Sequence, residues 1–162
     1  MKKVILEKNL MDLLKRHLLR EEGYRRSAYQ DSLGYWTIGI GRLIDGKKGG
    51  GVTIEEAFYL LDNEVKAKRA IIEAALPWFS ALDEVRQCVL VSMAYQLGTT
   101  GLFGFRTTLR AVAEGRFSDA AESMLKSRWA AQTPSRALRM SDAMRTGAVE
   151  SFKLDPEAPA DA

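Results

Sequence analysis

The chain has 162 residues, of which 46% are hydrophobic and 28% charged, and its formal net charge is +3 at pH 7. This length and composition predict one globular domain and exclude a disordered chain. The mild positive charge favours approach to anionic surfaces, but no base-reading motif accompanies it, so nucleic acid is not an expected partner.

The first expected element is a helix over residues 9–22. Leu10, Leu14 and Leu18 recur there at helical spacing, and Gly23 is a natural residue to end the helix. Residues 1–8 form an extension before it. The apolar run in this extension is too short for a signal peptide, and no stretch of the chain is long enough to span a membrane. We therefore expect the protein to accumulate in the cytoplasm.

A short hairpin is expected next, over residues 27–40. Aromatic and β-branched residues flank the turn-rich segment 31–34 in this region. Gly39 and Gly41 weaken a regular strand and suggest a bulge or a close approach of the backbone. Residues 45–51, with the sequence DGKKGGG, are expected to form a flexible loop.

A long helix is predicted from residue 54 to about residue 75. Thr53 and Glu56 have the spacing of a capping box, and Pro77 stops the helix. The rest of the chain is predicted to be helical, in segments from 82 to near 98, 107–114, 118–126 and from 134 onward. The order of elements indicates an α+β fold. One domain, 1–162, would comprise a small sheet-containing lobe at 23–60, a connecting helix at 61–75, a helical lobe at 9–22 and 76–150, and extensions at 1–8 and 154–162.

Three residues suggest sugar-cleaving chemistry: Glu22, Asp31 and Thr37. The expected structure places Glu22 at a helix end, and Asp31 and Thr37 on the neighbouring hairpin. A glycosidase needs one group to protonate the leaving oxygen and others to hold a water. Simpler interpretations stay open for each residue alone: a solvated surface glutamate, a turn-forming aspartate and a strand-forming threonine.

His17 is the only histidine of the chain, and Cys88 is the only cysteine. With one cysteine the chain cannot form an intrachain disulfide. One histidine and one cysteine also cannot assemble a His/Cys zinc site or a Ser-His-Asp triad built on separate elements. Cys88 lies in an apolar helical pattern, which favours a buried and unreactive thiol.

Several separated motifs are similar to one known family. The segments EEG, YQD and GYWTIGIG, followed by AYQLGTTGLFGF, LKSRWAAQTPSRALR and MRTG, resemble the phage lysozymes of the T-even type, in the same order. The resemblance runs from Leu10 to Gly147. It implies a lysozyme-like α+β fold with a small sheet lobe joined by a long helix to a helical lobe. It also implies hydrolysis, with inversion, of the β-1,4 bond between N-acetylmuramic acid and N-acetylglucosamine in peptidoglycan, with no metal or cofactor.

The resemblance also implies roles for individual residues. Glu22 matches the catalytic acid, Asp31 the second carboxylate and Thr37 the hydroxyl that helps hold the attacking water. Arg136 matches an arginine that pairs with the catalytic glutamate. The residues that match the glycan-binding groove are Leu43, Tyr95, Thr108 and Ser123, and those that match support for the interlobe core are Gln96 and Trp129. For these last six, ordinary core or surface packing remains an alternative.

The chain departs from the family pattern in several places. Arg42 stands where a histidine is common, so a structural His–Asp pair cannot form, although Arg42 can still meet a carboxylate. The connection between Arg42 and Thr53 is short, which predicts a smaller sheet lobe and a more open groove. Small residues, Ser123 and Ala130, replace larger groove residues, which leaves the subsite preferences open.

These features together favour a monomeric endolysin of a phage or prophage. Because no signal peptide is recognised, it would remain in the host cytoplasm until a separate holin-like membrane protein gives it access to the periplasmic cell wall. Two alternatives stay open. A lytic transglycosylase would use one glutamate and form an anhydro sugar, and a non-catalytic lysozyme-like module, such as part of a tail device, would bind glycan without cutting it.

Overall fold

A computed structural model describes residues 2–152, with only the backbone described for residues 2–9 and 152. The chain divides into two compact units, Met1–Tyr59 and Leu60–Ala162. The predicted lobe boundaries stay a prediction. The expected tail at 154–162 lies outside the described residues.

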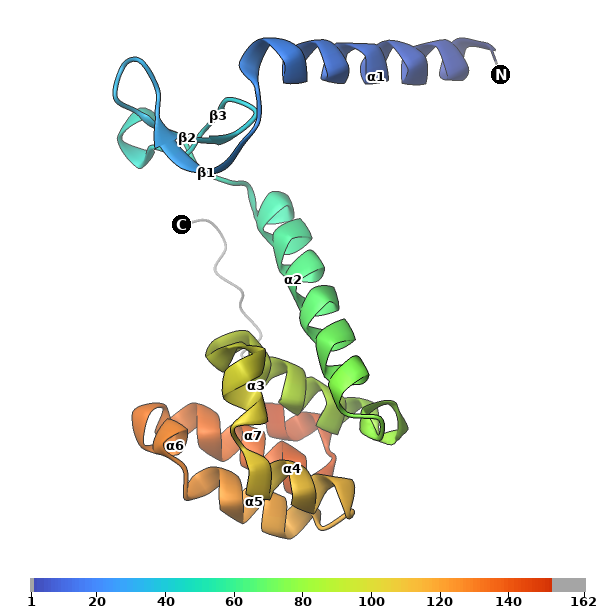
Figure 1. Ribbon diagram of the computed structural model, residues 1–162, viewed down its shortest axis with the longest axis vertical. Coiled ribbons are helices and arrows are strands. Elements are labelled where there is room, and N and C mark those ends of the chain that lie inside the picture. Colours follow the sequence, from blue (N-terminus) through green and yellow to red (C-terminus); the bar gives the residue numbers. More distant parts are fainter. Residues whose placement is uncertain (1, 153–162) are drawn as a thin grey trace. The chain divides into compact units, whose positions relative to one another are not determined.

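The first unit begins with the helix α1, Lys2–Glu22 (Figure 1). The predicted start at residue 9 was wrong, because the backbone is already helical from Lys2. Residues 2–8 contain no glycine or proline, and leucine, lysine and glutamate are good helix formers. The predicted end is confirmed, since Gly23 has a φ of 71° and its amide donates to the carbonyl of Leu19 at 3.1 Å.

A three-stranded antiparallel sheet follows in the order β1-β2-β3, built from Arg25–Gln30, Trp36–Gly39 and Arg42–Leu43. The predicted hairpin corresponds to β1 and β2, whose register places Tyr29 opposite Thr37. The pairing between β1 and β2 is irregular between Arg25 and Tyr29, as at a bulge. The third strand was not predicted, because two residues are too few for an alternating pattern to stand out.

Residues 45–51 are more ordered than the predicted flexible loop. Gly46–Lys48 form a 3-10 turn, capped by the side chain of Asp45, which accepts from the amide of Lys47 at 3.0 Å. Further along, the amide of Gly51 donates to the carbonyl of Leu43 at 3.2 Å. The glycines therefore do not make this segment irregular, because the amides of Gly49 and Gly50 bond to carbonyls within the segment and that of Gly51 bonds to β3.

The long helix α2, Ile54–Ala75, has the predicted bounds. The capping box is confirmed in both directions: the amide of Glu56 donates to Oγ1 of Thr53 at 3.2 Å, and the amide of Thr53 donates to Oε2 of Glu56 at 2.8 Å. The residues of α2 from Leu60 onward belong to the second unit.

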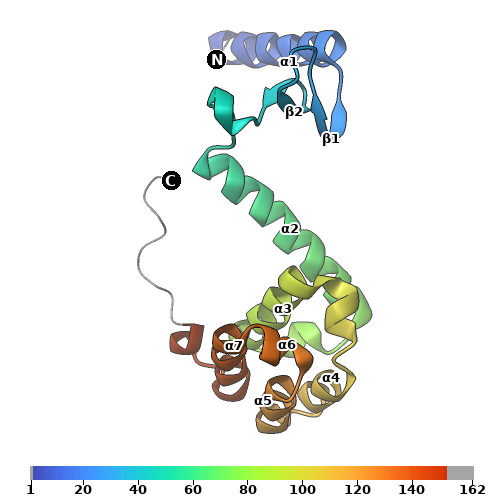
Figure 2. The same cartoon turned by 90° about the vertical axis from the view of Figure 1, so that its left-hand side faces the viewer.

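The second unit is a helical bundle (Figure 2). Its helices after α2 are α3 Glu84–Phe103, α4 Arg106–Ala113, α5 Phe117–Leu125, α6 Arg128–Gln132 and α7 Pro134–Thr146. Two of the predicted helices match α4 and α5 to within one residue at each end, and Pro134 opens α7 as predicted. The five-residue α6 was not predicted. Gly98 has φ 74° and ψ 160°, so the helix breaks where predicted, but helical turns resume after it.

The apolar core of this bundle is formed by side chains from α2 to α7 together with the turn Phe79–Ala81. The fully buried large side chains include Ile72, Phe79, Leu90, Met93, Met124 and Met144. Cys88 is exposed, contrary to the prediction, because the core face of α3 is formed by its neighbours Val89 and Leu90. Within residues 2–152 no single helix is long and apolar enough to cross a membrane; α3 and α4 meet the length and composition criteria only jointly, bent by 98°.

Candidate active site

Glu22 is the last residue of α1, next to the left-handed glycine that ends the helix. Its side chain is exposed, and within residues 10–59 no side chain bonds to its carboxylate. The carboxylate lies at a cavity of about 430 Å³ lined by Lys15, Leu18, Glu22, Ile40 and Gly41. A carboxyl group at a helix end beside an open cavity is accessible to a large substrate.

Asp31 lies in the turn directly after β1. Its Oδ1 accepts from the amides of Leu33 and Tyr35, each at 2.9 Å. The turn-forming interpretation of Asp31 is therefore confirmed, but it uses only one oxygen of the carboxylate. The other oxygen, Oδ2, has no hydrogen-bond partner within residues 10–59, so it can accept a proton from a water.

Thr37, on β2, is the one buried residue of residues 10–59, with 5% of its surface exposed. Its hydroxyl donates to the carbonyl of Tyr35 at 3.3 Å. The amide of Asp31 donates to the same carbonyl at 2.9 Å. Tyr35 thus joins the turn that holds Asp31 to the strand residue Thr37, and it fixes their relative position through the backbone.

Arg42 and Leu43 form the short strand β3. Leu43 pairs with Thr37 across the sheet and lines a cavity of about 380 Å³ with the glycines 49–51. Arg42 donates through Nε to the carbonyl of Gly51 at 2.9 Å and through Nη2 to Oε2 of Glu56 at 2.7 Å. Arg42 therefore meets a carboxylate, as the sequence allowed, and ties β3 to the first turn of α2.

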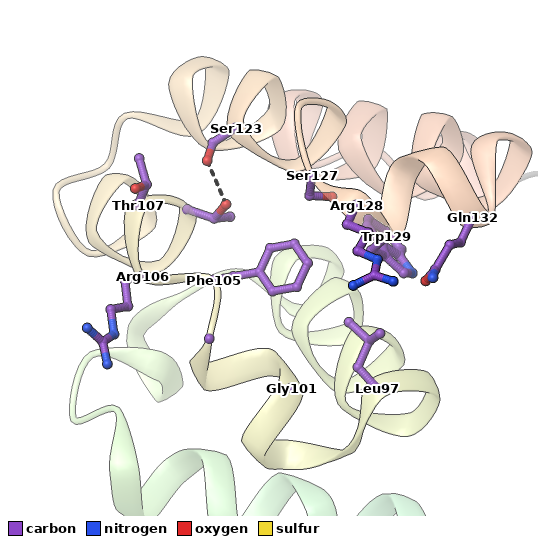
Figure 3. Close-up of a pocket in the computed structure, with 12 residues that line it drawn as sticks. Leu97, Gly101, Phe105, Arg106, Thr107, Ser123, Ser127, Arg128, Trp129 and Gln132 are labelled. Atoms are coloured by element: carbon purple, nitrogen blue, oxygen red, sulfur yellow. Dashed lines mark hydrogen bonds between the residues drawn. The ribbon is translucent and has the colours of Figure 1, made fainter.

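In the second unit, Thr108 and Ser123 lie together at a cavity of about 490 Å³ (Figure 3). Thr108, on α4, is buried, and its hydroxyl donates to Oγ of Ser123 on α5 at 3.0 Å. The cations Arg106 and Arg128 also line this cavity. The predicted pair of groove residues is therefore brought together by the packing of α4 against α5.

Trp129 and Gln96 also lie together in the second unit. The indole Nε1 of Trp129 donates to Oε1 of Gln96 at 2.8 Å, and the ring meets Phe105 edge to face with centroids 6.1 Å apart. Since Trp129 is 3% exposed, its N–H needs this partner. Trp129 is thus packed inside the second unit, with the exposed Gln96 as its hydrogen-bond partner.

Tyr95 and Arg136 line a second cavity of this unit, of about 360 Å³. The guanidinium of Arg136 donates through Nη2 to Oγ of Ser92 at 3.0 Å. The ammonium of Lys68 lies 5.2 Å from the centre of the Tyr95 ring. The expected pairing of Arg136 with Glu22 stays a prediction.

The predicted site residues thus divide between the two units. Glu22, Asp31, Thr37 and Leu43 belong to the first, and Tyr95, Gln96, Thr108, Ser123, Trp129 and Arg136 to the second. Sequence reasoning missed Tyr35 and Ser92 as partners of site residues, since only their neighbours carry recognisable chemistry. Within residues 10–151 no three His, Cys, Asp or Glu side chains gather in a way that could hold a metal ion.

An α+β fold with a carboxyl group at a helix end, and an aspartate and a threonine linked on the adjoining hairpin, has the features of a glycoside hydrolase. Comparison with known families supports this class. The model of the phage lysozyme family matches residues 19–140, so the chain belongs to the phage lysozyme family. It is therefore a lysozyme-like glycoside hydrolase of the muramidase type, and peptidoglycan is its substrate.

Curated relatives agree with this assignment. The chain is 27% identical to "Probable T4-type lysozyme 1" of Dictyostelium discoideum, over 89% of the chain and all of that protein. A second protein of the same organism, "Probable T4-type lysozyme 2", is 25% identical over 89% of the chain and its own full length. The "Pre-baseplate central spike protein Gp5" of Enterobacteria phage T4 is 31% identical over 88% of the chain, which spans 29% of that larger protein.

Proposed function

We propose that the protein is an endolysin that hydrolyses the β-1,4 bond between N-acetylmuramic acid and N-acetylglucosamine, with Glu22, Asp31 and Thr37 as its catalytic residues. The observation that carries this proposal is the hydrogen bonding of Asp31. One carboxylate oxygen holds the turn, the other has no hydrogen-bond partner within residues 10–59, and the shared Tyr35 carbonyl links the turn to Thr37.

The proposed reaction is a single displacement. The protonated Glu22 donates its proton to the glycosidic oxygen, which leaves with the electrons of its bond to C1 of the muramic acid. A water held by Asp31 and Thr37 adds to C1 from the opposite face, and Asp31 takes its proton. The products are a free hydroxyl on one sugar and an inverted hemiacetal on the other. Leu43, Tyr95, Thr108 and Ser123 would bind the glycan, and Arg136 would support Glu22.

Glu22→Gln tests this assignment, because glutamine keeps the size of the side chain and cannot donate the carboxyl proton. We expect loss of at least about a hundredfold in the rate at which purified peptidoglycan loses turbidity. Glu21→Gln is the matched control, since Glu21 precedes it on the same helix end and is also exposed. Near-full activity of Glu22→Gln would refute the assignment.

The products separate the alternative reactions. A hydrolase releases reducing muramic acid ends, whereas a lytic transglycosylase releases anhydro ends that are lighter by one water, so mass spectrometry of the digest distinguishes the two. Proton NMR of the first product formed reports whether the anomeric carbon is inverted. If wild-type protein binds the wall and releases no product, the chain is a glycan-binding module.

In the cell, the proposed endolysin waits as a monomer in the host cytoplasm and reaches the periplasmic wall through a holin-like membrane protein. Co-expression with and without such a protein tests this, and lysis without it would contradict the proposal. The similarity to a spike protein favours a second role, as a wall-cutting part of a phage particle. Detection of the chain in purified particles would support that role.

A further inference from the structure

Gly41 lies against the carboxyl group of Glu22. A Cβ atom built on Gly41 would be 3.3 Å from Oε2 of Glu22, 3.7 Å from Cδ and 3.8 Å from Cγ. The first distance is tighter than ordinary contact between a Cβ and its neighbours. A side chain at residue 41 would therefore require the carboxyl group of Glu22 to shift by a few tenths of an ångström.

The backbone at Gly41 is held from both sides. Gly41 lies in the tight connection between β2 and β3, where Ile38 pairs with Arg42. Arg42 is bonded to the carbonyl of Gly51 and to the carboxylate of Glu56. A shift of the turn to accommodate a side chain at residue 41 would disturb the pairing of Ile38 with Arg42. Movement of the Glu22 carboxyl group would be the easier response.

Gly41 and Glu22 also line the same cavity of about 430 Å³. Movement of the carboxyl group away from residue 41 would change both its direction and the shape of this cavity. General acid catalysis requires the carboxyl group within hydrogen-bonding distance of the leaving oxygen, so a displacement of even a fraction of an ångström lowers the rate.

We propose that Gly41 is a positioning residue for Glu22: its bare backbone leaves the space in which the carboxyl group is held toward the cavity. This inference rests on the proposed role of Glu22 as the general acid. A simpler explanation for Gly41 is its left-handed backbone, with a φ of 73°, which disfavours any other residue.

Gly39 separates these explanations. It is the last residue of β2, where it pairs with Arg25, and it has a φ of 69°, but a Cβ built on it would meet nothing within 4 Å. Gly39→Ala therefore imposes nearly the same backbone strain as Gly41→Ala without touching Glu22. The difference between the two variants measures the contact with the carboxyl group.

The experiment compares the kinetics of both variants on purified peptidoglycan. We expect similar thermal midpoints for the two variants, and a kcat for Gly41→Ala about ten- to a hundredfold below that of Gly39→Ala, with KM unchanged within about twofold. The pH profile of kcat should change for Gly41→Ala alone. Equal kcat values and equal pH profiles would overturn the inference. Because Glu22→Gln is tested in parallel, an active Glu22→Gln would instead refute the proposed function.

A second comparison applies if Gly41→Ala does not fold and Gly39→Ala does. In the Glu22→Ala background the carboxyl group is absent, so Gly41→Ala should then fold with a thermal midpoint close to that of Gly39→Ala in the same background. If the Glu22→Ala/Gly41→Ala protein also fails to fold by circular dichroism, the cost lies in the turn and the positioning role is wrong.

Discussion

Asp31 and Tyr35 are joined by two hydrogen bonds: the amide of Tyr35 donates to Oδ1 of Asp31, and the amide of Asp31 donates to the carbonyl of Tyr35, both at 2.9 Å. The aspartate therefore closes its own turn. Turn formation and the proposed catalytic role do not compete for this residue, because the turn uses only Oδ1 of the carboxylate.

This division predicts different results for two substitutions of Asp31. Asp31→Asn keeps an oxygen that can accept from the amides of Leu33 and Tyr35, so the unfolding free energy should fall by less than about 1 kcal/mol. Asp31→Ala loses both bonds and should lose about 1–2 kcal/mol. Peptidoglycan hydrolysis should fall by about a hundredfold or more in both. Urea unfolding and turbidity assays measure the two effects, and an active Asp31→Asn would contradict the proposed role.

The elements with local chemical signals could be predicted from the sequence. Thr53 and Glu56 bond to each other's amides within one turn, so their spacing was sufficient to place the start of α2. Two other signals are also local: Gly23 ends α1 through its positive φ, and Pro134 begins α7 through its fixed φ. The strand β3 depends instead on pairing with β2, and the helix α6 on packing with distant residues such as Gln96. The few residues of each carry no period of their own.

The candidate site divides in the same way. The residue types of Glu22, Asp31 and Thr37 were recognisable from motifs, and Thr108 and Ser123 were matched to the groove as two separate positions. The sequence could not give the bond that joins the members of this pair, because it depends on how α4 packs against α5. The links through the Tyr35 backbone and the contact of Gly41 with Glu22 were equally hidden, because any residue has a carbonyl and a glycine has no side chain to signal its neighbour.

Gly147 is predicted to be sensitive to substitution. It ends α7 with a φ of 69°, and a Cβ built on it would lie 2.6 Å from Nη1 of Arg86. The guanidinium of Arg86 donates to the carbonyls of Met144 and Arg145 at 2.8 and 3.0 Å. Its Cζ atom lies 3.7 Å from the centre of the Phe117 ring. Gly147→Ala should therefore strain the backbone and also displace the Arg86 guanidinium from its hydrogen-bond acceptors. Together these effects should lower the unfolding free energy by about 2–4 kcal/mol.

The matched control for Gly147 is Gly115→Ala. Gly115 has a φ of 70°, and a Cβ built on it would meet nothing within 4 Å. Backbone strain alone should then cost about 1–2 kcal/mol. Urea unfolding of both variants provides the comparison. An equal loss at the two glycines would show that the Arg86 side chain moves aside at little cost.

The capping box of α2 gives a third prediction. Thr53→Ala removes the acceptor for the amide of Glu56 and should lower the unfolding free energy by about 1 kcal/mol, whereas Thr53→Ser keeps the hydroxyl and should change it by only a few tenths. Glu56 should be more sensitive than Thr53, because its Oε2 also accepts from Arg42. Equal losses for Thr53→Ala and Thr53→Ser would show that the hydroxyl does not stabilise the helix.

The start of α3 predicts a dependence of stability on pH. Asp83 caps this helix by accepting from the amide of Arg86 at 3.0 Å, and its other oxygen pairs with Nη1 of Arg86 at 2.6 Å. Partial burial raises the pKa of Asp83, but hydrogen bonds from the Arg86 side chain and amide and the charge of Arg86 more than offset it, so the pKa lies below its usual range. A carboxyl group with a pKa depressed by folding stabilises the folded state above its unfolded pKa of about 3.9, and this stabilisation is lost as the pH falls through the folded value.

Asp83→Asn isolates this contribution, because asparagine is also a good N-cap residue and does not titrate. The wild type should exceed the variant in unfolding free energy by an amount that is constant from about pH 5 to pH 8 and shrinks below about pH 4. Because the Asp83 side chain is 41% exposed, screening by solvent should keep the difference to about 1 kcal/mol or less, and high salt should reduce it. Urea unfolding across this pH range measures the difference. A difference that stays flat down to pH 2 would show that the charge on Asp83 does not stabilise the fold.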